Sequence, residues 1–427
     1  MMEALDLFKS LLESKAVSSW TPFRSQAWDC LERIGLPQRK EESFQYVSLR
    51  KFYETILSAE KSVNKECDPD VSSLIMPESQ SSYLVFKDGS FCPHLSMLPS
   101  SLVVMPLEEA LGSSYGSFLK HRMHLLIEKE KDPWALLNAA LCQKGAFIYV
   151  PPKVQMKVPI QILNIQTEGS LLYEGSRIHL FLGAHADVQM VSSFHFLKDS
   201  KTMHNDFLDV FLEEKASFSH VFSNENPCSS WGFSSFRATL KKESRLNSSF
   251  ITFGSPGFRR DYFISLVGEG SEAHLKGLTV LGDRAQSHVN IHMDHSAPSC
   301  LSRQLFKNVL AAQSISSFTG KIYVSRAAQK TEAYQLNKNL LLSDQATANT
   351  KPNLEIFADD VKASHGATVS QLDEEQIFYL RTRGVSLPTA RSLLTIGFCQ
   401  EILDMVEIAS LRLKLSELCR QFLLSQG

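Results

Sequence analysis

The chain has 427 residues, 43% of them hydrophobic, and its 44 Lys and Arg residues nearly balance its 46 Asp and Glu residues, for a formal net charge of -2. This length allows two or three domains, unless one elongated element takes up most of the chain. The near-neutral charge excludes a global attraction to nucleic acid or to an anionic membrane, so we expect neither as a partner.

The first 35 residues predict two helices. Leu5, Phe8, Leu11 and Leu12 recur on one helical face, and a second amphipathic stretch covers about residues 25–35. The N-terminus has acidic residues instead of a basic segment followed by an apolar run, and 18 apolar residues never occur in succession. We therefore expect a soluble protein located in the cytoplasm.

Residues 60–140 mix loop, strand and helix signals. SYLVFKDGSF, residues 82–91, predicts a strand that runs into a turn. DPWALLNAAL, residues 132–141, predicts a helix with Asp132 as its N-cap. With the two preceding helices, these segments predict an N-terminal domain, residues 1–140, that is mainly helical and contains a loop-rich segment.

From Gly145 to about Asp360, short β-type runs follow one another with hardly an amphipathic helix between them. This excludes a doubly wound α/β domain, because parallel strands there are connected through helices. Segments that begin at residues 215, 244 and 272 share a loose pattern at a spacing of about 30 residues. That period favours stacked coils of a β-helix, while a sandwich or jelly roll stays open on pattern alone. The expected strands are AFIYV, PIQILNI, SRIHLFL, ADVQMVSSF, DFLDVFL, ASFSHVF, SSFITF, LKGLTVL, SHVNIHM, SISSF, KIYVS and LEIFA.

The end of the chain returns to helix. Asp373 is placed to cap one helix, which ends at Gly384, and Ser386 is placed to cap a second. A third helix is expected from about Ile408, since its apolar residues recur on one face. These patterns predict a small helical hairpin or bundle after the β region.

One histidine-rich segment suggests a metal site. His288, His292, Asp294 and His295 lie within SHVNIHMDHS, residues 287–296. In a strand the first two histidines would be roughly 13 Å apart, too far to coordinate one ion together. The apolar residues between them favour an alternating, half-buried strand, so we expect no metal site within this segment alone.

The remaining chemistry-bearing residues point to no complete catalytic motif. Asp359 and Asp360 are adjacent, so in a strand they would face opposite sides and act poorly as an acid and a base on one bond. A polysaccharide-acting β-helix enzyme, either a lyase or a hydrolase, is the alternative that this pair motivates. The eight cysteines form no CxxC pair and are expected to be buried thiols of a reducing compartment.

His365 follows the last β run and precedes the helix near Asp373. We expect it in a loop after Val361, at a junction where another subunit can dock. The alternative is a structural histidine that is hydrogen-bonded to the nearby carboxylates.

Four segments resemble one known family. Residues 330–398 contain DDVKASHGATVSQLDEEQIFYLRTRG, and residues 35–46, 133–154 and 288–324 keep the same order and spacing. The chain is similar to the SufB/SufD family of the SUF iron-sulfur cluster assembly system, and it resembles the SufD branch more than the SufB branch. The resemblance implies a right-handed parallel β-helix core, residues 141–365, flanked by helical domains at residues 1–140 and 366–427.

The resemblance also implies a non-catalytic scaffold subunit. Its partners would be a SufB-like paralogue and a SufC-like ABC-type ATPase, with a homodimer as the expected state of the isolated chain. No cofactor would be bound stably by the chain alone, and a transient iron-sulfur cluster or iron would form at the complex interface. The family's interface histidine falls on His365, the candidate metal ligand. The ATPase docking region maps onto Phe378, Tyr379, Arg383, Gly384, Pro388, Ala390, Arg391 and Phe398.

One position departs from the family pattern. Ala363 stands where many SufD sequences carry Cys, two positions before His365. Alanine cannot bind iron or carry a persulfide, so a thiolate at the interface must come from the partner or from a distant cysteine such as Cys399. A purely structural homodimer without metal function is the third alternative.

Overall fold

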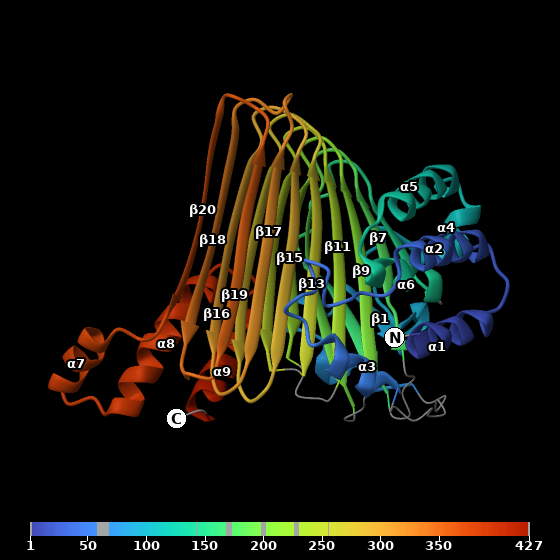
Figure 1. Cartoon of the computed structure of the whole chain (residues 1–427). Helices are drawn as coiled ribbons and strands as arrows, with labels where there is room; N and C mark the ends of the chain where they lie inside the picture. Colours follow the sequence, from blue (N-terminus) through green and yellow to red (C-terminus); the bar gives the residue numbers. More distant parts are fainter. Residues whose placement is uncertain are drawn as a thin grey trace.

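The fold is mainly β, with a β-solenoid core of about 7 turns and helices flanking it at both ends of the chain (Figure 1). This confirms the solenoid and overturns the sandwich and jelly-roll alternatives. The computed structural model describes residues 2–57, 68–142, 144–167, 173–197, 202–225, 230–254 and 256–425.

Successive strands alternate between two facing sheets, here called sheet A and sheet B. Sheet A has the order β2 (Ser90–Phe91), β1 (Tyr83–Lys87), β5 (Ile160–Gln166), β8 (Asp187–Phe196), β10 (Ser217–Asn224), β12 (Arg245–Phe253), β14 (Glu272–Leu281), β16 (Leu301–Leu310), β18 (Thr331–Leu341) and β20 (Val361–Ser370). Sheet B has the order β19 (Thr347–Ile356), β17 (Ile315–Val324), β15 (Gln286–His295), β13 (Gly257–Leu266), β11 (Trp231–Leu240), β9 (Met203–Leu212), β7 (Arg177–Leu182), β4 (Ala146–Val150) and β3 (Val103–Pro106), while β6 (Tyr173–Glu174) pairs with β9.

The register explains the period of about 30 residues. Ser217 pairs with Arg245, Arg245 with Glu272, and Glu272 with Leu301, all in parallel. Because side chains alternate along a strand, every second residue faces the space between the sheets, where the main hydrophobic core lies. Each coil therefore buries its apolar residues against the coils on either side of it.

The expected strands are all present, and SISSF and KIYVS join into the single strand β17. Apolar runs predicted neither the short strands β3 and β6 nor the long strands β11, β13, β16, β18 and β20. The long strands carry charged and amide residues, as in RRDYF of β13 and QLNKN of β18, so they lack a continuous apolar signal. Pairing with neighbouring coils, rather than local propensity, makes them strands.

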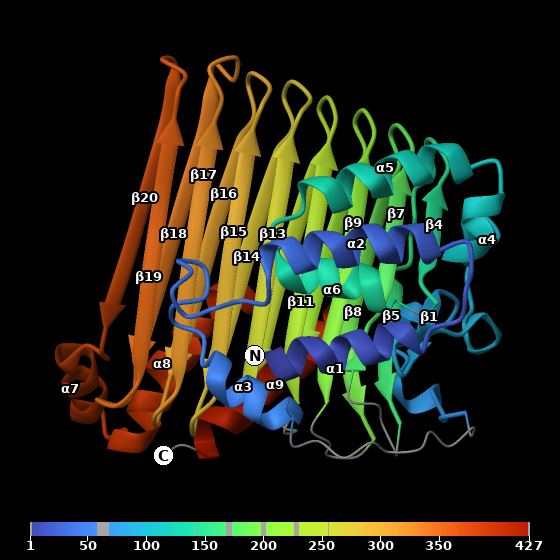
Figure 2. The same cartoon turned by 45° about the vertical axis from the view of Figure 1, so that its right-hand side comes forward.

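The N-terminal helices cover the outer face of sheet B (Figure 2). Asp132 caps α6 as expected, since its side chain accepts a hydrogen bond from the Trp134 amide. The segment before β4 also supplies β1 and β3, which pair with β5 and β4 of the solenoid. The helices are α1 (Met2–Glu13), α2 (Thr21–Ile34), α3 (Leu49–Leu57), α4 (Leu107–Gly112), α5 (Gly116–Lys129) and α6 (Pro133–Leu141), with short 3-10 helices at Ser72–Leu74, Pro77–Ser79 and Pro93–Leu95.

Three C-terminal helices follow β20: α7 (Glu374–Thr382), α8 (Leu387–Leu403) and α9 (Ala409–Ser425). Asp373 and Ser386 cap α7 and α8 through the amides of Glu375 and Thr389, as expected. The helices α8 and α9 pack on the outer face of sheet A, whereas α7 projects from the body (Figure 1). Within the described ranges, no helix is both long and apolar enough to cross a membrane.

Most described cysteines are buried, in line with their expected role as packed thiols. Cys142, Cys300, Cys399 and Cys419 are buried, and Cys30 and Cys92 are partly exposed. Cys67 and Cys228 lie outside the described residues.

Candidate functional site

The two ends of the solenoid differ. At the N-terminal end, β2 and β3 run antiparallel to β1 and β4, and buried Phe91 and Leu102 belong to the core there. At the C-terminal end, β19 pairs only with β17 and β20 only with β18. One edge of each last strand therefore presents backbone N–H and C=O groups without a strand neighbour, a surface suited to strand addition by another chain.

His365 lies inside β20 and not in a loop, so the expectation of a docking loop after Val361 is wrong. Residues Thr331–Leu340 of β18 pair one by one with Val361–Ser370. This continuous template extends the strand through Gly366, which on its own disfavours strand structure. The final coil therefore runs beyond the expected domain boundary at residue 365, to Ser370.

The inner face of β20 carries His365. Val361 and Ala363, four and two positions earlier, pack against the core, so alternation places His365 on the same side. Its register partner is Gln335 of β18, which is buried in the interior. His365 itself is exposed, because no further coil covers it.

A groove of about 610 Å³ runs along the outer face of sheet A beside His365. Side chains of three neighbouring strands, including Lys276, Arg303 and Tyr334, form its floor, and Glu401 and Met405 line its helical side. Burial lowers the pKa of Lys276. The backbone of the His365 segment thus separates this outer groove, whose lining is mixed polar and apolar, from the solenoid interior.

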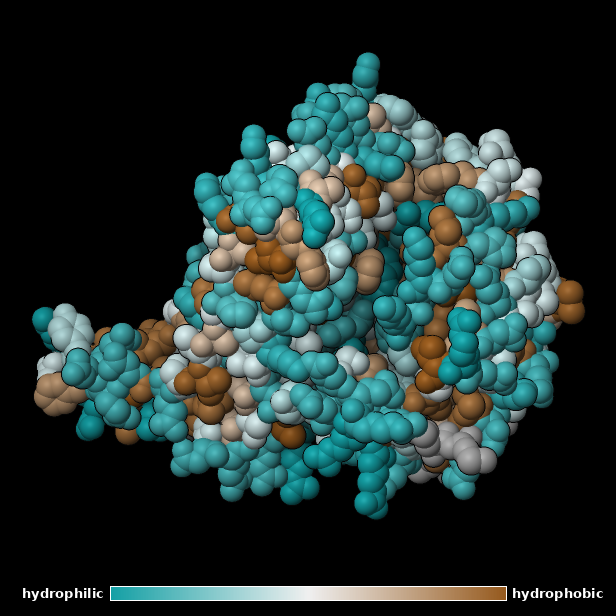
Figure 3. Space-filling view, turned by 45° about the horizontal axis from the view of Figure 1, so that its top comes forward, coloured by the Kyte–Doolittle hydropathy of each residue, from teal (hydrophilic) through white to brown (hydrophobic). Residues whose placement is uncertain are grey.

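The expected docking residues fall into two groups. Phe378 and Tyr379 are 69% and 58% exposed, and with Glu374, Glu375 and Thr382 they line a hollow of about 510 Å³ on α7. This part of the chain forms the lobe with hydrophobic residues that protrudes at the left of Figure 3. Exposed Arg383, Gly384, Pro388 and Arg391 follow it.

The other two expected docking residues are occupied within the chain. Ala390 is fully buried. Phe398 is half-buried: the Lys307 ammonium lies 4.3 Å from its ring centroid and donates to its carbonyl at 2.8 Å. Lys307 also pairs with Glu401, so this contact fixes α8 on sheet A and leaves little of Phe398 for a partner.

The chain alone offers a sparse donor set for iron. The described residues contain no group of three or more His, Cys, Asp or Glu side chains that could hold a metal ion. Cys399 is buried against Cys419, and this contact together with burial raises the pKa of its thiol well above the usual range. Cys399 is therefore unsuited to supply a thiolate at the open end, contrary to the suggestion from the sequence.

The histidine-rich segment forms β15 with its apolar residues in the core, as expected. Two of its histidines are buried instead of exterior. His288 hydrogen-bonds Ser317 at 2.7 Å and His295 hydrogen-bonds Ser302 at 2.8 Å. His292 stacks on Phe263, with ring centroids 4.7 Å apart, so each histidine has a structural partner.

The acidic pair does not support hydrolysis. Asp359 and Asp360 are exposed in the bend between β19 and β20, not on a strand. There the Asp360 backbone accepts from the Lys330 amide and donates to the Gln329 side chain. The pair shapes the turn of the last coil, and the polysaccharide-enzyme alternative loses the feature that motivated it.

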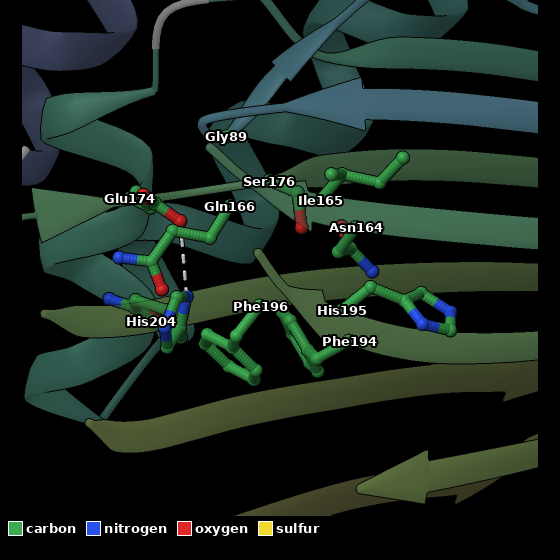
Figure 4. Close-up of a pocket in the computed structure, with 11 residues that line it drawn as sticks. Gly89, Asn164, Ile165, Gln166, Glu174, Ser176, Phe194, His195, Phe196 and His204 are labelled. Atoms are coloured by element: carbon green, nitrogen blue, oxygen red, sulfur yellow. Dashed lines mark ion pairs between the residues drawn. The ribbon is translucent and has the colours of Figure 1, made fainter. Parts of the chain in front are cut away.

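A second polar site lies inside the N-terminal half of the solenoid. Glu174 and His204 form an ion pair of 3.2 Å beside Phe194 and Phe196, around a cavity of about 10 Å³ (Figure 4). Burial raises the pKa of Glu174. A cavity of this size has room for one water molecule, so it is no substrate site.

Comparisons with known proteins agree with the geometry. A family model described as SUF system FeS cluster assembly, SufBD core domain, matches residues 165–398, and another described as SufBD protein N-terminal region matches residues 3–162. The iron-sulfur cluster assembly SufBD family protein slr0076 of Synechocystis is 29% identical, covering 92% of this chain and 89% of the relative. The iron-sulfur cluster assembly protein SufD of Escherichia coli is 29% identical, covering 94% of this chain and 92% of the relative. Protein ABCI7, chloroplastic, of Arabidopsis thaliana is also 29% identical, covering 94% of this chain and 86% of the relative.

Proposed function

This chain belongs to the SufBD family of the SUF system for iron-sulfur cluster assembly, and from that premise we propose that it is a non-catalytic scaffold subunit. In this proposal it pairs with a SufB-like paralogue through the open end of its solenoid and with a SufC-like ATPase through α7 and the start of α8. The cluster then forms at the paralogue interface as the cargo of the complex, without a cofactor held by the chain alone.

The observation that carries the proposal is the unpaired last coil. Both sheets end on short antiparallel strands at the N-terminal end, β2 and β3, and on the ten-residue strands β19 and β20 at the C-terminal end, which offers the longer edges for strand addition. A paralogue with an equivalent end is a shape-matched occupant, since its own last strands can continue both sheets. His365 on the inner face of β20 would then lie at the junction of the two solenoids.

His365 suits the role of a ligand contributed to a shared site. Imidazole replaces cysteine on iron in some clusters, and His365 is exposed on a rigid strand. Position 363, two residues before it on the same strand, is alanine and offers no thiolate. The sulfur-bearing ligands of the proposed site therefore come from the partner.

Co-expression tests the assembly directly. The full chain, tagged, is purified together with its SufB-like and SufC-like partners, and both are expected to copurify at micromolar concentration. A stable preparation of the chain that retains neither partner would refute the scaffold proposal. In a pull-down from native cells, the same proposal requires an ATPase among the captured proteins.

Docking of the ATPase is expected to depend on the exposed aromatic residues of α7. Replacing Phe378 and Tyr379 together with Ser should weaken the ATPase affinity on the order of 1,000-fold, since aromatic anchors of interfaces each contribute on the order of 2 kcal/mol. The melting temperature should stay constant, because both side chains are mostly exposed. The matched control is Leu413→Ser, at an apolar α9 residue that is 71% exposed; equal losses in both variants would remove α7 from the interface.

Cluster formation is expected to depend on His365. The variant His365→Ala should lower the iron and sulfide content of the purified complex severalfold without dissociating it, because a single exposed side chain is lost. His121→Ala, at an exposed histidine of α5, is the control. Unchanged iron and sulfide in the His365 variant would exclude this histidine from the site.

A further inference from the structure

A column of amide side chains leads through the solenoid interior to His365. Gln304 of β16 pairs in register with Gln335 of β18, which pairs with His365 of β20. Both glutamines are 3% exposed. Polar side chains are costly in a core unless they are hydrogen-bonded, so this column requires an explanation.

The amide of Gln335 is held in one orientation. Its Nε2 donates to Gln304 Oε1 at 2.7 Å. Across the interior it lies against Gly320 of β17, where an added Cβ would be only 2.1 Å from Gln335 Nε2. Glycine at position 320 thus gives the amide the space that it occupies, and the preceding coil fixes its direction.

The oxygen of the Gln335 amide lacks a hydrogen-bond partner among the described residues. Gln335 Oε1 is buried and accepts no hydrogen bond from the described residues. Because Nε2 is engaged with Gln304, Oε1 is the branch of the amide that remains available to a donor from the next coil. His365 occupies the corresponding position of that coil.

A second amide contact holds the strand that carries His365. Asn339 Nδ2 donates to the Thr368 carbonyl of β20 at 2.9 Å, and Asn339 Oδ1 accepts from Asn308 at 2.6 Å. The last coil is therefore tied to the coils before it by side chains as well as by the sheet. This fixes the backbone of His365 and leaves its ring orientation to be set by Gln335.

We propose that Gln335 is a positioning residue for His365. The structure shows no hydrogen bond between the two side chains. A turn of the exposed His365 ring brings one imidazole N–H to Gln335 Oε1, and the hydrogen bond formed there fixes both the ring orientation and the tautomer. In a neutral imidazole the second nitrogen then carries the lone pair and faces the open end, ready to bind a metal. The part of this proposal that concerns iron rests on the proposed function, whereas the tautomer is a property of the chain alone.

The experiment measures the tautomer by ¹⁵N NMR of the full chain labelled at histidine, at pH 8. The His365→Ala spectrum identifies the signals of His365. One tautomer is expected to dominate in the native chain, and Gln335→Met, which keeps the length but removes the acceptor, should give the mixture of a free imidazole. Gln335→Glu keeps an acceptor and should restore a single tautomer. A native spectrum with mixed tautomers, or an unchanged spectrum in Gln335→Met, would overturn the proposal.

Iron content separates this proposal from the proposed function. In the assembled complex, Gln335→Met should lower bound iron severalfold and by no more than His365→Ala does, because Gln335 acts only through that histidine. If His365→Ala leaves the iron unchanged while Gln335→Met still alters the tautomer, the positioning role stands and the ligand role fails. If His365→Ala removes iron but Gln335→Met alters neither readout, the positioning role fails and the ligand role stands.

Discussion

Replacing Arg237 with Met is expected to lower the free energy of unfolding by about 3–5 kcal/mol, since removal of one partner leaves buried charges uncompensated. Arg237 on β11 is 4% exposed and joins the N-terminal helical layer to sheet B. Its guanidinium binds Glu130 at 2.8 Å, Asp261 at 3.0 Å and Asp132 at 3.6 Å.

The electrostatics of this cluster explain the size of the effect. Burial and the negative charge of Asp261 raise the pKa of Asp132 to about 7, even though Arg237 opposes that shift. Without the guanidinium, the carboxylates would repel one another in a largely buried site. Met can fill most of the volume of the Arg237 side chain, so the loss of stability comes mainly from the missing positive charge and not from a cavity.

A urea unfolding curve followed by tryptophan fluorescence measures the difference. The control is Arg245→Met on β12, where the arginine is 64% exposed and lies 3.5 Å from Glu272. Exposed ion pairs contribute at most about 1 kcal/mol, so the control should unfold close to the native chain. Equal midpoints for the two variants would show that the buried cluster contributes no more than a surface pair.

The solenoid could be predicted because its period is visible in the sequence, whereas its polar strands could not be found from apolar runs. Strands such as β13 and β18 form because each residue pairs with the residue at the corresponding position of the next coil. Such pairing between residues far apart in the sequence leaves no run of apolar residues. The spacing of about one coil is also the signal that could have revealed the residues around His365. Gln304, Gln335 and His365 are about one coil apart, so repeat alignment would have placed them in one column.

The errors at residues 359–365 have a common physical reason. Asp359 and Asp360 look like the end of a strand, and Gly366 looks like the start of a loop. The free edge of β18 nevertheless continues to Leu341, and its unpaired backbone groups select ten partners from the following segment. The local propensities of these residues do not decide where β20 begins and ends, because pairing with the neighbouring strand β18 sets both ends.

Stability is expected to fall by several kcal/mol between pH 7 and pH 5, because the core holds neutral histidines. Burial is the main cause that lowers the pKa of each one: to about 4 for His179 and His295, to about 3 for His288, and well below the usual value for His220. In the unfolded chain these groups bind protons with a pKa near 6.5, so their contribution is complete above that pH and is lost as the pH falls toward about 4.

Three buried acids act in the opposite direction but do not compensate. Burial raises the pKa of Asp132 to about 7, that of Asp206 to about 6, and that of Glu174 in the same direction, so protonation of these groups adds stability as the pH falls. Each of the four histidines costs about 2 kcal/mol at pH 5, at roughly 1.4 kcal/mol for every pH unit below 6.5, and together they exceed the gain from the three acids.

Urea unfolding midpoints at pH 7 and pH 5 test the sign of this dependence. His288→Gln should reduce the difference between the two pH values by about 2 kcal/mol, since one proton-excluding group is removed. Because glutamine can retain a hydrogen bond to Ser317, which His288 contacts at 2.7 Å, the variant should still fold at pH 7. Equal or greater stability of the native chain at pH 5 would mean that the core admits the charged histidines, and the same pH dependence in His288→Gln would place the titrating groups elsewhere.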